Sequence, residues 1–212
     1  MAMEAIRTIL SCSNLDFCGI HGHIGSQILE DEPYRPTGRN LAAFAMEVES
    51  KLGVQVKEIN LGGGFGIMYT EEDTPLPIVE YMKEAKAGLE EVYSAAGKPL
   101  PVIGIEPGRR IVGEAGITLY TVALRKEIPG VRSYVSVDGG MTDNPRYALY
   151  QSAYEAVVAN KAAQQKDFTA TIAGRCCESG DLVQENITLP QPRRGDLLAV
   201  HGCVQLFHGV QL

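Results

Sequence analysis

The feature that most constrains this chain is the alternation of strand-like and helical patterns in its first half. Short apolar runs end in glycine or polar clusters, and amphipathic segments at residues 36–53 and 76–97 separate them. This rhythm is typical of parallel strands that are joined by helices. Within the first helical segment, Asn40 is a possible N-cap and Gly53 a stop signal.

The pattern changes near residue 113. Strand-like runs separated by Gly, Pro and Asp dominate from there on, at residues 117–128, 133–140, 168–176 and 196–202. Runs of this kind are typical of a β-rich domain. We therefore predict an α/β part over residues 1–112 and a β domain over residues 113–212.

The charge and the cysteine content limit the classes of protein to which this chain could belong. The formal net charge of −7 argues against nucleic-acid binding, which needs a basic face. No run approaches the roughly 18 apolar residues of a membrane span, and the first ten residues do not have the pattern of a signal peptide. Five cysteines, with neither a C-x-x-C pair nor a disulfide framework, indicate a reducing cytoplasm.

Three apolar runs of the first half end in clusters that could carry chemistry, at residues 21–27, 62–66 and 106–109. In parallel α/β proteins the loops after the strands build the active site, so three such clusters suggest one shared site. We expect one anion-sized space to be surrounded by Ser26, Gly62, Gly63, Gly64, Gly108 and Arg109.

Each of these clusters also has a plainer interpretation. Gly62–Gly66 can bring backbone N–H groups close to a phosphate, or form only a flexible turn; no Lys-Ser or Lys-Thr follows, as a Walker loop requires. Glu106 could hold a proton on a ring nitrogen and Arg109 could bind phosphate, or both could belong to a solvated turn. His21 and His23 could bind metal, but no carboxylate or Cys nearby completes a set; His23 could instead stack on an aromatic cofactor or serve the structure alone.

The second half contains two more clusters. Residues 176–181 read Cys-Cys-Glu-Ser-Gly-Asp, in which a thiol beside two carboxylates can transfer protons, although an unreactive cysteine in a turn is the commoner case. Residues 138–146 read as a loop that ends in Arg146, a possible binder of anions or part of a plain surface loop.

Taken together and in this order, the segments HIGSQ, GGGFG, EPGR, VDGGMTDNPR and CESGD resemble the diaminopimelate decarboxylases, a family of fold-type-III enzymes dependent on pyridoxal phosphate. The resemblance covers about residues 20–200. It implies the last βα units of a pyridoxal-phosphate-binding (β/α)8 barrel, followed by a C-terminal β-barrel-like domain. The implied reaction is decarboxylation of meso-2,6-diaminopimelate to L-lysine by a cytoplasmic homodimer that binds a small amino acid, and neither nucleic acid nor membrane.

The resemblance also implies roles for single residues. In the cofactor site, His23 stacks on the pyridine ring, Ser26 and the backbone of Gly62, Gly63 and Gly64 bind the phosphate, Gly108 and Arg109 add donors, and Glu106 pairs with the pyridine nitrogen. Substrate carboxylates are held by Arg109, Arg146 and Tyr150. Glu178 reads the distal ammonium, and Cys177 gives a proton to the carbanion in the partner subunit's site.

Three departures from the family follow from the residues. Tyr147 stands where we expect Pro. None of Lys51, Lys57, Lys83 and Lys86 matches the family's cofactor lysine, so we expect the chain to begin after it and to be inactive alone. With permitted codon choices, the +1 frame of residues 201–212 can read as a Gly-Ala-Tyr-like family tail, which suggests a frameshift near Val200.

Two alternatives stay open. The chain could be a catalytically dead remnant with at most an interaction role. It could also be related to ornithine or arginine decarboxylases, although Glu178 and the Asn-Pro-Arg segment at residues 144–146 argue against those substrates.

Overall fold

The computed structural model describes residues 1–202, which form two compact units. The first unit comprises Met1–Gly66 and Thr74–Gly108; the second comprises Ile67–Asp73 and the chain from Arg109 onward. The short segment 67–73 therefore packs with the second unit, although the chain on both sides of it belongs to the first. The frameshift is expected to affect residues 201–212. Only His201 and Gly202 of this segment are among the described residues, and the rest lies outside them.

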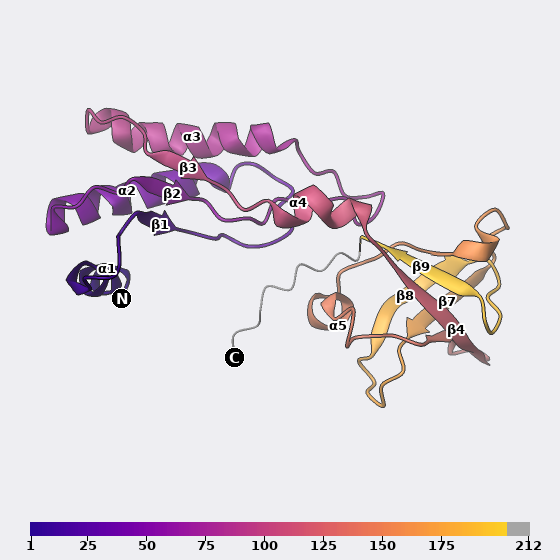
Figure 1. The fold of residues 1–212 in the computed structure, drawn as a ribbon. Coiled ribbons are helices and arrows are strands. Elements are labelled where there is room, and N and C mark those ends of the chain that lie inside the picture. Colours follow the sequence, from indigo (N-terminus) through magenta and orange to yellow (C-terminus); the bar gives the residue numbers. More distant parts are fainter. Residues whose placement is uncertain (203–212) are drawn as a thin grey trace. The chain divides into compact units, whose positions relative to one another are not determined.

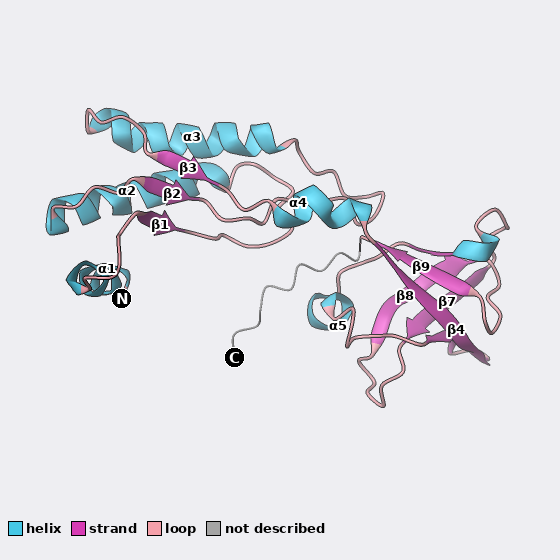
Figure 2. Ribbon diagram, in the orientation of Figure 1, coloured by secondary structure: helices cyan, strands magenta, loops and turns pink. Residues whose placement is uncertain are grey.

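The first unit is a parallel three-stranded sheet with helices between its strands (Figures 1 and 2). Its elements are α1 (Ala2–Ser11), β1 (Gly19–His21), α2 (Tyr34–Leu52), β2 (Glu58–Asn60), α3 (Ile78–Ala95) and β3 (Val102–Gly104), with strand order β1-β2-β3. Helix α2 starts after Pro33 rather than at Asn40, and Gly53 ends it in the left-handed conformation. Pro36 does not break the helix, because a proline in the first turn costs no helical hydrogen bond. No helix within residues 1–202 has the length and apolarity to cross a membrane.

The two faces of this sheet differ. Ile59 is fully buried in a core to which the helices α2 and α3 contribute, and Ile20 and Ile103 of the neighbouring strands pack against that core. Because side chains alternate along a strand, Asn60 and Gly104 belong to the opposite face, where the backbone of Gly104 lies against the side chains of Glu58 and Asn60. This second face is polar.

Two glycines let α2 and α3 approach each other closely. A Cβ at Gly38 would lie 2.2 Å from the carbonyl oxygen of Ala85, and one at Gly88 would lie 2.0 Å from that of Arg35. Because the blocking atoms are backbone, the helices would have to move apart.

We expect Gly88→Ala to lower the free energy of unfolding by about 2 kcal/mol in urea denaturation, although alanine is the better helix former. The control, Gly97→Ala, places its methyl group in open space and should reveal only the backbone cost of a positive φ. An unfolding free energy that rises in Gly88→Ala would contradict this packing.

The second unit is built around a six-stranded sheet of order β6-β9-β4-β5-β7-β8, which is nearly closed because its edge strands β6 and β8 approach each other. All its neighbouring strands are antiparallel except β5 and β7. Its elements are α4 (Gly108–Val112), η1 (Gly113–Ala115), β4 (Ile117–Ile128), β5 (Arg132–Val137), α5 (Arg146–Tyr150), β6 (Ala156–Val158), η2 (Ala159–Lys161), β7 (Phe168–Ala173), β8 (Leu182–Leu189) and β9 (Leu197–His201). The predicted fold class is confirmed.

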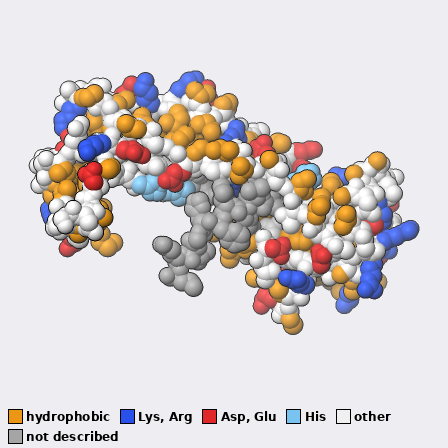
Figure 3. All heavy atoms as spheres, in the orientation of Figure 1, with side chains coloured by type: hydrophobic (Ala, Val, Ile, Leu, Met, Phe, Trp, Pro, Cys, Tyr) orange, Lys and Arg blue, Asp and Glu red, His pale blue; other side chains and the backbone are white. Residues whose placement is uncertain are grey.

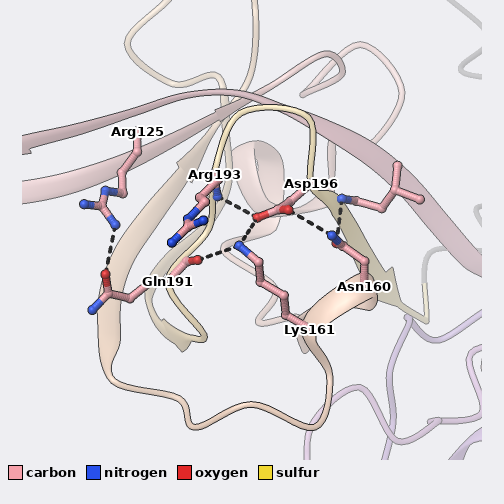
Figure 4. A network of polar contacts seen from close by, with 7 residues as sticks. Arg125, Asn160, Lys161, Gln191, Arg193 and Asp196 are labelled. Atoms are coloured by element: carbon pink, nitrogen blue, oxygen red, sulfur yellow. Dashed lines mark hydrogen bonds and ion pairs between the residues drawn. The ribbon is translucent and has the colours of Figure 1, made fainter.

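A buried polar network lies at the start of β9 (Figure 4). Asp196 accepts hydrogen bonds from the Lys161 ammonium, from Asn160 Nδ2 at 2.8 Å and from the backbone N–H of Arg193 at 2.6 Å. Burial alone would raise the pKa of Asp196, but these donors outweigh it and hold the pKa below its ordinary value. The ionised carboxylate therefore stabilises the fold.

The stability that Asp196 contributes should depend on pH. Because its folded pKa is depressed, that contribution is complete above the unfolded pKa of about 3.9 and disappears as the pH falls through the lower folded pKa. We expect Asp196→Asn to lower the free energy of unfolding by about 2 kcal/mol at pH 7 and by less at acidic pH, where the folded carboxylate becomes protonated. Urea titrations of both proteins across this range measure the difference. The same loss at both pH values would show that ionisation of Asp196 contributes nothing.

Candidate functional site

In the first unit, the glycine loop after β2 is hydrogen-bonded to the loops after β1 and β3. The backbone N–H of Gly63 donates to His23 Nδ1 at 3.3 Å, and the carbonyl of Gly62 accepts from the N–H of Glu106 at 2.8 Å. Since His23 Nδ1 accepts a hydrogen bond, the neutral ring carries its proton on Nε2. The three predicted clusters after the strands thus meet at the same end of the sheet.

Close approach of the neighbouring loops explains why this loop consists of glycines. A Cβ at Gly63 would lie 2.4 Å from the carbonyl oxygen of Glu106, and one at Gly64 would lie 2.1 Å from that of Gly25. Gly62 and Gly64 also have positive φ values of 71° and 92°, which residues with a side chain rarely adopt. The loop is therefore clamped between its two neighbours and is more than a flexible turn.

Asn60, the last residue of β2, joins the parts of this site. Its Oδ1 accepts from the N–H of Gly62 at 2.8 Å, and its Nδ2 donates to Glu106 Oε1 at 3.2 Å. His21 Nε2 lies 3.6 Å from the same oxygen, and both side chains are about half exposed. In the space-filling view, histidine side chains lie beside acidic ones on the surface of the first unit (Figure 3). Glu106 is thus oriented but remains open to solvent.

The backbone donors of this site are partly used within the protein. The N–H groups of Gly62 and Gly63 donate to Asn60 and His23, and that of Gly108 donates to the carbonyl of Glu106 at 2.9 Å. Of the three loop glycines, only Gly64 has an N–H without an acceptor among residues 1–202. Ser26 is exposed on the loop after β1. Arg109 belongs to the second unit, so its convergence with Gly63 stays a prediction.

In the second unit, two arginines lie around one aromatic ring. The guanidinium carbon of Arg146 lies 5.1 Å from the centre of the Tyr69 ring, and that of Arg109 lies 6.0 Å from it. Burial lowers the pKa of Arg109; Tyr69 opposes this shift and the like charge of Arg146 adds to it. The Nε of Arg146 is buried and has no hydrogen-bond partner within the described chain. Two neighbouring guanidiniums with an unused buried donor favour an anionic ligand.

Helix α5 carries Arg146 and Tyr150. Tyr150 is exposed, and its ring centre lies 5.8 Å from the Arg146 guanidinium. The intervening Tyr147, where the family resemblance led us to expect Pro, donates from its hydroxyl to Glu185 Oε2 at 2.6 Å, and Glu185 also pairs with Arg132. Burial, followed by the bond to Glu185, raises the pKa of Tyr147 to about 12. This departure therefore ties α5 to strand β8.

The loop 176–181 separates its two cysteines into different surroundings. Burial, and then the adjacent Asp181 carboxylate, raise the pKa of the Cys176 thiol, whereas Cys177 is exposed. Glu178 is exposed too, and its carboxylate accepts only from its neighbours Ser179 and Gly180 within the described chain. Cys177 and Glu178 thus remain available to a ligand.

Asp181 links the loop that precedes Arg146 to the loop that carries Cys177. It is only 2% exposed, and its carboxylate accepts from the backbone N–H groups of Met141 and Cys176, both at 2.6 Å. It also fills the space beside Gly140 and Gly174, where a Cβ would lie 2.3 Å from its Oδ1. Asp181 therefore holds the loops in register and is structural rather than reactive.

Sequence reasoning missed the roles of Asn60, Tyr69 and Asp181. Asn60 directly precedes a glycine loop, a position from which an amide can bond both to that loop and to the next strand, so a signal existed. Nothing in the local pattern singles out Tyr69. Within residues 1–202, no group of three or more His, Cys, Asp or Glu residues could hold a metal ion.

Comparison with known proteins adds a family to this geometry. Residues 1–113 match the pyridoxal binding domain of the pyridoxal-dependent decarboxylases. The chain is similar to the diaminopimelate decarboxylase of Bacillus subtilis (strain 168), with 47% identity over 93% of this chain and 45% of that protein, and to the one of Bacillus methanolicus, with 46% identity over 94% and 46%. It spans about half the length of the curated relatives it matches.

Solved structures give the same likeness. The diaminopimelate decarboxylase of M. jannaschii in complex with L-lysine superposes with a TM-score of 0.80 and 29% identity, over 95% of this chain and 45% of that one. The enzyme of Helicobacter pylori complexed with L-lysine gives a TM-score of 0.77 and 27% identity, over 95% and 47%.

Proposed function

This chain belongs to the pyridoxal-dependent decarboxylase family, and we propose that it is the part of a diaminopimelate decarboxylase that holds pyridoxal phosphate and recognises meso-2,6-diaminopimelate, the precursor of L-lysine. The observation that carries the proposal is the hydrogen-bonded junction of three loops in the first unit. There His23 and Glu106 both contact the loop Gly62–Gly64. The donor set fits the cofactor, because it offers a ring to stack, a carboxylate for a ring nitrogen and backbone N–H for phosphate.

The first unit would hold the cofactor. Pyridoxal phosphate supplies an electron sink for the charge that departing carbon dioxide leaves behind. Glu106, oriented by Asn60, holds a proton on the pyridine nitrogen. The N–H of Gly64, assisted by Ser26, would bind the phosphate, and the ring of His23 would stack on the pyridine.

The second unit would recognise the substrate. Arg109 and Arg146 bind carboxylates as charge-assisted donors, and Tyr150 lies next to Arg146 as a further donor. Glu178 accepts the distal ammonium. Cys177 delivers a proton from its Sγ to the substrate carbon that lost the carboxylate. Cys176, whose pKa is raised beside Asp181, is the less suitable donor of the two.

We place the enzyme in the cytoplasm as a homodimer, with Cys177 acting in the partner's site. An exposed apolar stripe on the second unit supports an assembly: Ile117 and Leu119 of β4 are 60% and 61% exposed, and Leu197 of the paired strand β9 is 43% exposed. Surface of this kind favours a protein partner. Sedimentation of Leu119→Lys beside the unchanged chain tests whether the stripe joins two copies.

Titration with pyridoxal phosphate tests the cofactor site. We expect the bound cofactor to quench the tyrosine fluorescence of the chain. The variant Gly64→Ala should lose this binding, because its new methyl group meets the carbonyl of Gly25. Gly97→Ala, a second glycine of positive φ in open space, should bind normally. With 15N-labelled cofactor, the ring nitrogen should give a protonated shift in the wild type and a neutral one in Glu106→Gln. No binding by the wild type, or unchanged 15N shifts in Glu106→Gln, would contradict the proposed site.

A further inference from the structure

The segment 67–73 supplies the second unit with an aromatic platform. Tyr69 is 7% exposed and belongs to the hydrophobic core of that unit. Its ring meets the Tyr154 ring edge-on, with 5.6 Å between centres and 87° between planes. The core therefore fixes where the faces of the Tyr69 ring point.

Polar contacts hold the backbone of this segment in place. Asp73 Oδ2 accepts from the N–H groups of Tyr69 and Thr70, both at 3.0 Å. Glu114 accepts from the N–H of Met68 at 3.3 Å, and Glu155 accepts from that of Glu71 at 3.2 Å. The segment is bonded at both ends, so the ring is part of a built structure.

Both arginines that we assign to carboxylate binding lie around this ring, as described above. Two like charges so close repel each other, and each would gain hydration by turning out into solvent. The negative face of an aromatic ring attracts guanidinium groups. A ring held by the core can therefore keep both groups together before any anion arrives.

We propose that Tyr69 is a positioning residue that holds Arg109 and Arg146 side by side, and so prepares the second unit to bind a dicarboxylate. This inference rests on the proposed function, in which those arginines bind substrate carboxylates. Tyr69 acts through the two arginines and need not contact the substrate. This role would extend the substrate site to Tyr69, a residue distant in sequence from Arg109 and Arg146.

A fluorination series at position 69 tests the role of the ring. Fluorine withdraws electron density from the ring face and weakens its attraction for cations, while the shape changes little. We expect pimelate, a dicarboxylate without amino groups, to bind Tyr69→Phe within twofold of the wild type. The affinity for pimelate should then fall stepwise, by about tenfold in all, when the phenylalanine at position 69 is replaced first by difluorophenylalanine and then by pentafluorophenylalanine. Calorimetric titration of the 212-residue chain measures the affinity.

Phe168 provides the matched control. Its ring carries a different guanidinium, that of Arg125, at 5.0 Å. The same fluorination at Phe168 should leave pimelate affinity unchanged. Equal losses at both positions, or constant affinity across the series at position 69, would overturn the proposal.

A second readout separates this inference from the proposed function. If pimelate does not bind the wild type, carboxylate binding by the two arginines fails, and the NMR signals of their Nε–Hε groups decide the role of Tyr69. Assigned through Arg109→Lys and Arg146→Lys, both signals should move between Tyr69→Phe and its pentafluoro form. Signals that stay in place would refute the positioning role, whatever the substrate.

Discussion

The 212-residue chain, purified and supplied with pyridoxal phosphate, should release carbon dioxide from meso-diaminopimelate no faster than the uncatalysed reaction. The family's chemistry needs a lysine amine at the cofactor aldehyde, and no lysine of the first unit, as far as the structure describes it, lies at the junction of the three loops. In the first unit, Lys51 lies in the last turn of α2, Lys83 and Lys86 belong to α3, Lys57 precedes β2 at the end away from the glycine loop, and Lys98 pairs with Glu49. The chain should therefore lack the acceleration of ~10⁶ or more that enzymes provide.

Adding the missing amine should restore the reaction. The portion of the Bacillus subtilis relative that this chain does not match, expressed separately and mixed with it, is the test. In that mixture Cys177→Ala should lower the rate ~100-fold or more, as expected for loss of a proton donor, and Cys176→Ala should change it only a few-fold. Carbon dioxide release by the pure chain that disappears in Cys177→Ala would show that another lysine serves.

Asp181→Ala should lower the free energy of unfolding of the second unit by about 3 kcal/mol. The substitution leaves two part-buried backbone N–H groups, those of Met141 and Cys176, without this acceptor, and each costs about 1–3 kcal/mol. It also opens a cavity between Gly140 and Gly174. Urea denaturation followed by the near-ultraviolet signal of the tyrosines measures the loss.

Glu178→Ala is the control for Asp181→Ala, since it removes a carboxylate from the same loop that is exposed and bonded only locally. We expect a change of less than about 0.5 kcal/mol. Equal effects of the two substitutions would mean that Asp181 does not hold the loops together. Since Asp181 joins the loop that precedes Arg146 to the one that carries Cys177, its loss should also weaken pimelate binding.

Periodicity and glycine placement predicted much of the fold. The apolar run at residues 117–128 became strand β4 without a change of bounds, and Gly53 ended α2 as expected. Strand β8 was missed because polar residues and a positive φ at Asn186 break its alternation. Helix α2 began before the predicted cap because Tyr34 is buried against the rings of Phe65 and Tyr81, a tertiary contact that local sequence does not reveal.

The candidate site divides in the same way. The ordered motifs singled out His23, Glu106 and Arg146 as candidates, because each stands next to glycine or proline in a loop after an apolar run. They could not locate Tyr69, whose contribution depends on a packing partner 77 residues further along the chain, at Arg146. The role of Asp181 was hidden for a related reason, since its partner Met141 lies on a different loop.

The membership of residues 67–73 in the second unit has a consequence for synthesis on the ribosome. These residues are made in the middle of the first unit, yet their contacts include Glu114, Tyr154 and Glu155, which emerge much later. Ile67 and Tyr69 therefore stay exposed in the nascent chain while α2 and α3, the helices before and after them in the sequence, pack together. Their partners become available only when the β strands of the second unit have been synthesised. Nascent chains arrested before residue 150 should expose this apolar segment to chaperones, whereas chains arrested after β9 should protect it.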